Sequence, residues 1–157
     1  MTEQEALTVL RTADPVRAAT AAAALWQLWH QSGRPDLDAI LRQGIEAMEA
    51  QQLAEAEELF GRLIEIAPEF AEGWNKRATA LYLAGEHRRS LADCAEVLRR
   101  NPRHFGALSG AGLNHVQLEE HREALDWFQR ALAVNPNMPA VRLEVRRLEE
   151  LLRGRTT

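Results

Sequence analysis

Large and small apolar residues return along this chain at a fixed distance of 34 residues, with polar and charged residues between them. Four separate series of positions keep that distance, and a series of prolines keeps it as well. The four series are Ile40, Trp74 and Leu108; Gly44, Ala78 and Gly112; Ala56, Ser90 and Ala124; and Phe60, Cys94 and Phe128; the prolines are Pro68, Pro102 and Pro136. A fixed period of roughly 20–50 residues is typical of proteins that are built from structural repeats.

Each 34-residue unit predicts two amphipathic helices that are joined by a short turn, near residues 50–53, 84–87 and 118–121. Small residues in the second and third series allow the two helices to approach closely, and the bulky residue of the fourth series fills the remaining space. The proline ends the second helix, because it lacks an N–H donor and restricts the residue before it. One such pair cannot bury its apolar face alone, so we expect the units to stack on their neighbours.

These positions resemble the tetratricopeptide repeat (TPR), which has large apolar, small, small, aromatic and proline residues at the corresponding places. The units are 37–70, 71–104 and 105–138, and Cys94 in the second unit departs from the aromatic residue of the pattern. The resemblance implies an all-α fold, a right-handed α-solenoid of helix-turn-helix repeats in a single TPR domain over residues 1–157.

Both flanks of the repeats predict further helices. Residues 139–153 carry apolar residues at helical spacing on one face, which is typical of a capping helix at the C-terminal end. Upstream, the pair Asp14 and Pro15 predicts the start of a helix that continues to about Gln31. We therefore expect a degenerate helical pair over 3–36, with a short first helix.

Two tryptophans of this N-terminal pair are expected in its core. Trp26 lies 34 residues before Phe60, and Trp29 lies 34 residues before Leu63. Both therefore occupy positions that hold bulky packing residues in the following unit, and the pattern favours packing over a ligand platform.

Three closely spaced glycines in the stretch HFGALSGAGL, Gly106, Gly110 and Gly112, raise the question of a phosphate-binding loop. A Walker loop needs a lysine after its last glycine and a preceding strand, and a dinucleotide-binding turn needs a third correctly spaced glycine. Neither pattern is present, and the period places 105–118 in a helix. We interpret Gly112 as a small packing residue, and we hypothesise that Gly106 and Gly110, with Ser109, leave bare backbone for a partner to approach.

Titratable residues give no catalytic or metal-binding pattern. None of the five histidines forms the His-x-x-x-His or HExxH spacing of a zinc site. His87 and His121 share one position in the turn between helices, where we expect them to be solvated. Cys94, the only cysteine, is expected to be buried as a small apolar residue. The sequence therefore predicts no metal, no cofactor and no enzymatic activity.

The charge and hydropathy of the chain narrow its partners. A formal net charge of −4 gives no reason to expect nucleic acid as a partner. The apolar run AATAAAALW is too short to span a bilayer, and the N-terminal stretch lacks the pattern of an export signal. We expect no membrane insertion and, by default, a cytoplasmic protein. The segments WNKRAT and PRHFGALSG resemble a group of bacterial TPR proteins, which favours a bacterial source.

An uneven charge distribution leaves two interpretations open. The unit 37–70 is acidic and the unit 71–104 is basic. This contrast can steer a partner or an end-to-end self-contact. The interpretation that we favour is a set of solvated faces with ion pairs between repeats.

The family resemblance also implies a peptide groove, because the first helices of stacked TPR units line a concave surface. Its positions 5, 6, 9 and 12, together with position 2, fall on residues of mixed character. The expected groove residues are Leu41, Ile45, Met48, Asn75, Lys76, Thr79, Tyr82, Gly106, Ser109, Gly110, Leu113 and Val116.

We expect this groove to hold a peptide or helix of a partner protein, which makes the chain a non-enzymatic interaction module. One branch of the family clamps the C-terminal carboxylate of chaperone tails with Lys, Asn and Arg at set positions, and neither register of this sequence supplies them. The alternative function is a self-associating assembly module that uses exposed repeat ends, which would make the protein a homo-oligomer.

Overall fold

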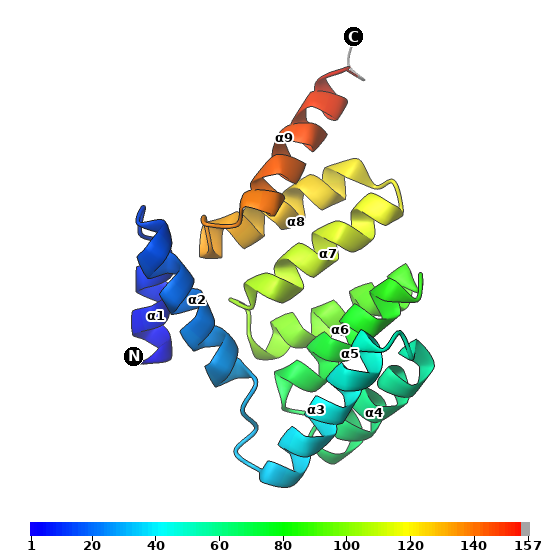
Figure 1. Ribbon diagram of the computed structural model, residues 1–157. Coiled ribbons are helices and arrows are strands. Elements are labelled where there is room, and N and C mark those ends of the chain that lie inside the picture. The colour runs from blue at the N-terminus through cyan, green and yellow to red at the C-terminus, as the bar shows by residue number, and fades with distance from the viewer. Residues whose placement is uncertain (155–157) are drawn as a thin grey trace.

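The computed structural model describes residues 1–154, and within that range the chain is helical with no strand (Figure 1). The helices follow the predicted order of a short N-terminal pair, three helix-turn-helix units and a final helix. They are α1 (Glu3–Leu10), α2 (Pro15–Trp29), α3 (Pro35–Glu49), α4 (Leu53–Ile66), α5 (Ala71–Leu83), α6 (His87–Arg100), α7 (Phe105–Gln117), α8 (His121–Val134) and α9 (Pro139–Gly154).

Helices α3 to α9 stack in chain order as an α-solenoid, which confirms the predicted fold class. Each helix packs on the next one, and the first helices of neighbouring units, α3 with α5 and α5 with α7, also touch. Helix α9 begins at Pro139 and packs on α8, where Val141 and Leu148 are buried. The first helices α3, α5 and α7 therefore form one continuous inner face.

A residue with a positive φ angle follows the first helix of every unit, at equivalent positions of the 34-residue period. Gln51, Gly85 and Glu119 have φ angles of 64°, 81° and 58°. The next residue in each turn donates its backbone N–H five residues back, as Gln52 does to the carbonyl of Ala47 at 2.9 Å. This bond satisfies a carbonyl at the helix end, and only one of the three turns uses glycine for it.

Bulky and small residues face each other between the two helices of a unit. A Cβ on Gly112 would lie 2.5 Å from Cε1 of Phe128, and a Cβ on Gly44 would overlap the Phe60 ring. The second unit lacks the aromatic ring, and there Cys94 packs with the larger residue Ala78. The structure thus agrees with the interpretation of Gly112 as a packing residue and with the expected burial of Cys94.

Ion pairs join neighbouring units on the outer surface. Arg88 of α6 contacts Glu120 at 2.7 Å, and Arg89 of α6 pairs with Glu57 of α4. The basic side chains of the second unit thus meet acidic side chains on both sides. This arrangement agrees with the favoured interpretation of the uneven charge.

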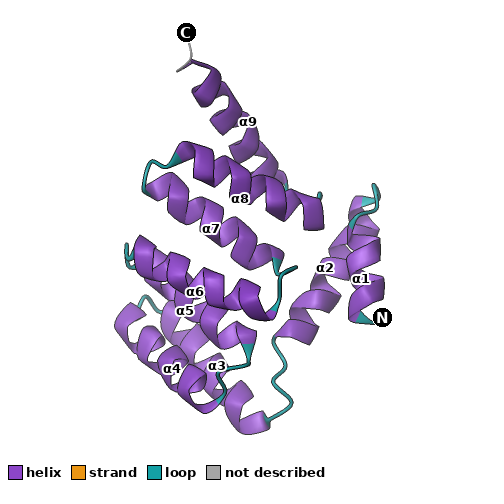
Figure 2. Ribbon diagram, turned by 180° about the vertical axis from the view of Figure 1, so that it is seen from behind, coloured by secondary structure: helices purple, strands orange, loops and turns teal. Residues whose placement is uncertain are grey.

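The N-terminal pair docks along the edge where the units are joined (Figures 1 and 2). Its core contains Leu7, Leu10 and Leu25, and Phe105 and Val134 from the third unit pack against it. Asn137 adds two hydrogen bonds, because its Nδ2 donates to the carbonyls of residues 10 and 12 at 3.0 and 3.1 Å. These contacts join positions that are more than a hundred residues apart in the sequence.

The expected burial of Trp26 is wrong, and Trp29 is only partly buried. Trp26 is 51% exposed, whereas its neighbour Leu25 is fully buried against α1. Helix α2 turns the face with Ala21 and Leu25 to the short helix α1, so its packing register is displaced by one residue from that of the repeats. The indole of Trp26 is thereby left on the outside of the pair, toward the solenoid.

Candidate functional site

A shallow cleft of about 150 Å³, here the α5–α7 cleft, lies between two first helices of the solenoid. Helix α5 contributes amide, hydroxyl and phenol side chains, and α7 contributes small residues, one leucine and one asparagine. The lining consists of Asn75, Ala78, Thr79, Tyr82, Cys94, Gly106, Ser109, Gly110, Leu113 and Asn114. The surface is thus apolar at Leu113 and polar along α5.

A larger cleft of about 410 Å³, here the α2 cleft, lies between α2 and the first turns of α5 and α7. One wall is formed by α2 and the other by the solenoid. The lining consists of Ala22, Ala23, Trp26, Trp29, His30, Glu72, Asn75, Lys76, His104, Phe105 and Gly106. Asn75 and Gly106 belong to both clefts, so the two form one connected surface.

The structure brings eight of the twelve expected groove residues to this connected surface. They are Asn75, Lys76, Thr79, Tyr82, Gly106, Ser109, Gly110 and Leu113. The other four lie elsewhere. Ile45 and Met48 are half-buried against the core of the first unit, and Val116 is half-buried against the core formed with α8 and α9.

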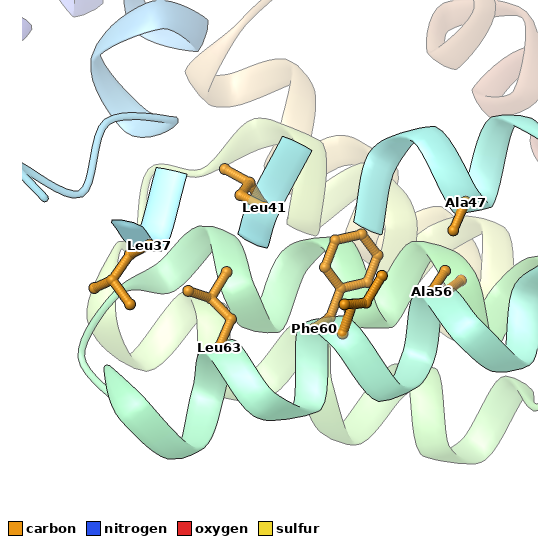
Figure 3. Close-up of a cluster of buried hydrophobic side chains, with 8 residues drawn as sticks. Leu37, Leu41, Ala47, Ala56, Phe60 and Leu63 are labelled. Carbon is orange, nitrogen blue, oxygen red and sulfur yellow. The ribbon is translucent and has the colours of Figure 1, made fainter. Parts of the chain in front are cut away.

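Leu41 requires a correction, because it is only 4% exposed and does not present a groove surface. Leu41 lies one turn after Leu37 on α3, and both side chains belong to the buried core cluster of the first unit (Figure 3). Leu63 of α4 and Ala80 of α5 belong to the same buried cluster. The position that the family uses for ligand contact is therefore occupied here by a core residue.

The two glycines proposed as bare backbone differ in their surroundings. A Cβ on Gly106 would lie 3.0 Å from Cε1 of His104, so the histidine ring occupies the space beside it. A Cβ on Gly110 would meet only the sulfur of Cys94, at the ordinary contact distance of 3.7 Å. Internal packing therefore accounts for a small residue at Gly106, whereas Gly110 remains open to the α5–α7 cleft.

The floor of the α2 cleft holds a fully buried carboxylate, that of Glu72. His104 Nε2 donates to it at 2.5 Å, and Asn75 Nδ2 donates at 3.2 Å. His104 Nδ1 accepts the backbone N–H of Ala107 at 3.0 Å, which assigns the proton of the neutral ring to Nε2. Burial alone would raise the pKa of Glu72, but the His104 hydrogen bond and the neighbouring charges outweigh it and lower that pKa.

His30, at the end of α2, faces the same carboxylate. Its Nδ1 donates to the carbonyl of Trp26 at 2.7 Å, and its ring stacks on the Trp26 indole with centroids 3.8 Å apart. Nε2 lies 3.4 Å from Glu72 Oε2 and makes no hydrogen bond within the described residues. Burial lowers the pKa of His30, and the attraction of Glu72 offsets this only in part. The His30 ring therefore closes the cleft floor from the α2 side.

A buried polar chain stiffens the α5–α7 cleft from below. Asn114 Nδ2 donates to Ser90 Oγ at 2.9 Å, and Ser90 Oγ donates to the carbonyl of Ala78 at 2.6 Å. Asn114 Oδ1 lies 3.0 Å from Nδ1 of His87. His87 and His121 are half-buried, so the expectation that both are solvated is wrong. His87 and His121 begin α6 and α8, and Asn114 of the third unit reaches back to His87.

Three further properties can be stated for residues 1–154. No group of three or more His, Cys, Asp and Glu side chains in this range is arranged to hold a metal ion. No helix in the same range is long and apolar enough to cross a membrane. Burial raises the pKa of Cys94 to about 12, so its reactive thiolate is scarce near neutral pH.

Sequence reasoning did not find the cluster of His30, Glu72 and His104. His30 belongs to the N-terminal pair, whereas Glu72 and His104 stand near the two ends of the unit 71–104, at unrelated places in the 34-residue pattern. The period relates equivalent residues of stacked units, and it carries no signal for contacts between the N-terminal pair and the solenoid.

The fold defines a helical-repeat protein whose first helices line two connected clefts. The tetratricopeptide repeat family model matches residues 41–98 and again 76–139. The chain is also 31% identical over 147 residues to a TPR repeat-containing protein from Rhizobium etli, which covers 94% of this chain and 72% of that protein. This chain therefore belongs to the tetratricopeptide repeat family.

Solved structures agree with this assignment. The TPR domain of Sgt2 from Aspergillus fumigatus superposes with a TM-score of 0.74 at 19% identity, over 78% of this chain and 83% of that chain. The first TPR domain of RPAP3 (Spaghetti), bound to the HSP90 peptide SRMEEVD, gives a TM-score of 0.72 at 20% identity, over 74% and 92% of the two chains. At these identities the similarity shows the shared fold.

Proposed function

We propose that this chain is an interaction module that holds a peptide or helix of a partner protein against α5 and α7. The observation that carries the proposal is the α5–α7 cleft, in which seven of the twelve expected groove residues meet. Leu113 is 38% exposed there. It gives a partner an apolar contact beside the polar residues of α5.

The fold neighbours support a peptide as the ligand, because the RPAP3 domain was solved with one. The proposal does not extend to chaperone tails. Two clamp positions are occupied here by the buried Leu41 and the half-buried Ile45, and two more by Gly106 and Gly110. Their lack of charge removes the donors that hold a terminal carboxylate, so we propose a ligand that is recognised by its side chains.

Affinity capture from the source organism, quantified by mass spectrometry, tests the proposal. Leu113→Glu places a charge in the cleft, and Tyr82→Ala removes the phenol at its edge. Both variants should lose the partner that the wild type captures, with unchanged helicity. Leu143→Glu is the matched control, because Leu143 is 62% exposed on α9, outside both clefts. Equal capture by all four proteins would overturn the proposal.

A further inference from the structure

The α2 cleft has an aromatic wall that is already in place. Trp29 stacks on His104 with ring centroids 4.8 Å apart and contacts Phe105, and its Nε1 donates to Glu3 at 3.3 Å. Trp26 is held by the His30 ring and remains half exposed. Rings that are positioned before a ligand arrives lose little conformational entropy when it binds.

Small residues leave space in the cleft beside this aromatic wall. Ala22 and Ala23 precede the tryptophans on α2, and Gly106 lies opposite on α7. The volume of about 410 Å³ falls in the range of sites that bury compact organic groups. It therefore has room for one large apolar side chain and the backbone beside it.

A single cation stands at this cleft. Lys76 is the only lysine of the chain. Its Nζ lies 5.9 Å from the centroid of the Trp26 ring, and no ion pair or hydrogen bond of this ammonium is found among residues 1–154. The nearby carboxylate of Glu72 is fully buried and is already bound by His104 and Asn75. Lys76 attracts this carboxylate through space without pairing with it directly, so the donors of its ammonium are left for an external acceptor.

We propose that the α2 cleft is a specificity subsite for the partner peptide, which takes a large apolar side chain against Trp26 and Trp29 and a neighbouring Asp or Glu at Lys76. The inference rests on the proposed function, because the same peptide continues from this cleft into the α5–α7 cleft through the shared residues Asn75 and Gly106. Apolar burial supplies the anchor, and the unpaired charge selects an acidic over a basic neighbour.

The charge of Lys76 has no substitute elsewhere in the cleft lining. The remaining lining residues with titratable side chains are His30, Glu72 and His104, which bind or face one another on the cleft floor. A basic peptide would meet the Lys76 ammonium without a free carboxylate to offset it. Because Glu72 is fully buried, Lys76 therefore favours an acidic residue of the peptide over a basic one.

Selection of random peptides displayed on phage against the immobilised full chain tests this inference. The wild type should enrich sequences with an aromatic or large aliphatic residue next to Asp or Glu. Lys76→Gln should keep the apolar preference and lose the acidic one, with roughly tenfold weaker binding of the best wild-type peptide. Trp26→Ala should lose the apolar preference. Arg17→Gln is the matched control, since it removes one positive charge from α2 outside the cleft lining.

The sole lysine provides a second, direct measurement. Reductive ¹³C-methylation places one side-chain reporter on the protein, at Lys76, in addition to the label on the N-terminal amino group. Titration with a synthetic peptide of the enriched sequence should shift the Lys76 methyl signal. Replacement of its acidic residue by the uncharged amide should reduce that shift at equal peptide concentration.

The outcomes separate this inference from the proposed function. The subsite would be overturned if the enriched peptides showed no acidic preference, or if that preference persisted in Lys76→Gln. In either case, peptide binding that depends on Leu113 would leave the proposed function standing. If no peptide is enriched by the wild type, both proposals fail. Circular dichroism of each variant should match the wild type.

Discussion

Phe128 occupies the space directly beside the backbone of Gly112, with its Cε1 2.5 Å from the position that a Cβ on that glycine would take. The contact joins the middle of α7 to the middle of α8. Gly110, only two residues earlier on the same helix, has no such neighbour. The same substitution at the two glycines should therefore change the free energy of unfolding differently.

Gly112→Ala should lower the free energy of unfolding by about 1–3 kcal/mol, because the ring or the helix has to move. Alanine is favoured over glycine in a helix by roughly 1 kcal/mol, which reduces the loss but does not reverse it. Gly110→Ala, as the matched control, should be neutral or stabilising by up to about 1 kcal/mol. Urea unfolding of both variants measures the difference, and equal effects would contradict the assigned packing.

The pair Ala78 and Cys94 replaces the glycine and phenylalanine of the other two units. Cys94→Phe alone should destabilise the chain by about 1–3 kcal/mol, since the Ala78 methyl group fills the place that the ring needs. In the double variant with Ala78→Gly, part of this loss should return. A double-mutant cycle should give a favourable coupling of at least about 0.5 kcal/mol. Strictly additive effects would show that the second unit packs in another way.

Docking of α2 should depend on pH through His30. Its pKa is lowered by burial from the ordinary value of 6.5, so the unfolded chain takes up a proton more readily than the folded one. The stabilising contribution is therefore complete above about pH 6.5 and is lost as the pH falls through the lowered pKa. The lowered pKa of Glu72 likewise makes the folded chain less stable as the pH falls, but at more acidic pH. The other titratable groups that face His30 and Glu72 are Lys76 and His104.

Urea unfolding in buffers at about pH 7.5 and 5.5 measures this dependence. The wild type should lose more stability between the two values than His30→Gln does. An identical loss in both proteins would exclude His30 as the group responsible.

Asn137→Ala should loosen the N-terminal pair selectively. The substitution removes both donors and leaves the carbonyls of Leu10 and Thr12 without this partner, which costs about 1–3 kcal/mol. Native-state hydrogen exchange should become faster in α1 and α2 while α3 to α6 stay unchanged. Asn137→Asp keeps the size but removes the donors, so it should be no better than alanine. Wild-type protection with Asp at this position would contradict the proposed role of the donors.

Much of the solenoid was predictable because its packing repeats with the sequence. The 34-residue period indicates which residues face each other inside a unit, and Gly112 and Cys94 lie where that period places them. The turns were also predictable in position, although positive φ angles at Gln51 and Glu119 were not. Neither residue type signals that geometry, which accompanies the backbone hydrogen bonds of Gln52 and Glu120 to the ends of the preceding helices.

The packing of the N-terminal pair could not be predicted from the period. A period assigns Trp26 the environment of Phe60 only if the two helices pack in the same register, and the short helix α1 changes that register. The cluster around Glu72 depends on the same docking, so it could not be derived from any one unit. Leu41 shows a related limit, because a position that usually faces a ligand can also hold a core residue.

The hydrogen bonds of Asn137 to the start of the chain have a consequence for how such a protein can evolve. Open repeat arrays grow or shrink by whole units, since each unit meets only its neighbours. Here an inserted or deleted unit would move the residues that receive α1 and α2 by one step along the solenoid. The duplication that would lengthen an open array would therefore undock its first two helices, so selection for docking also sets the number of units.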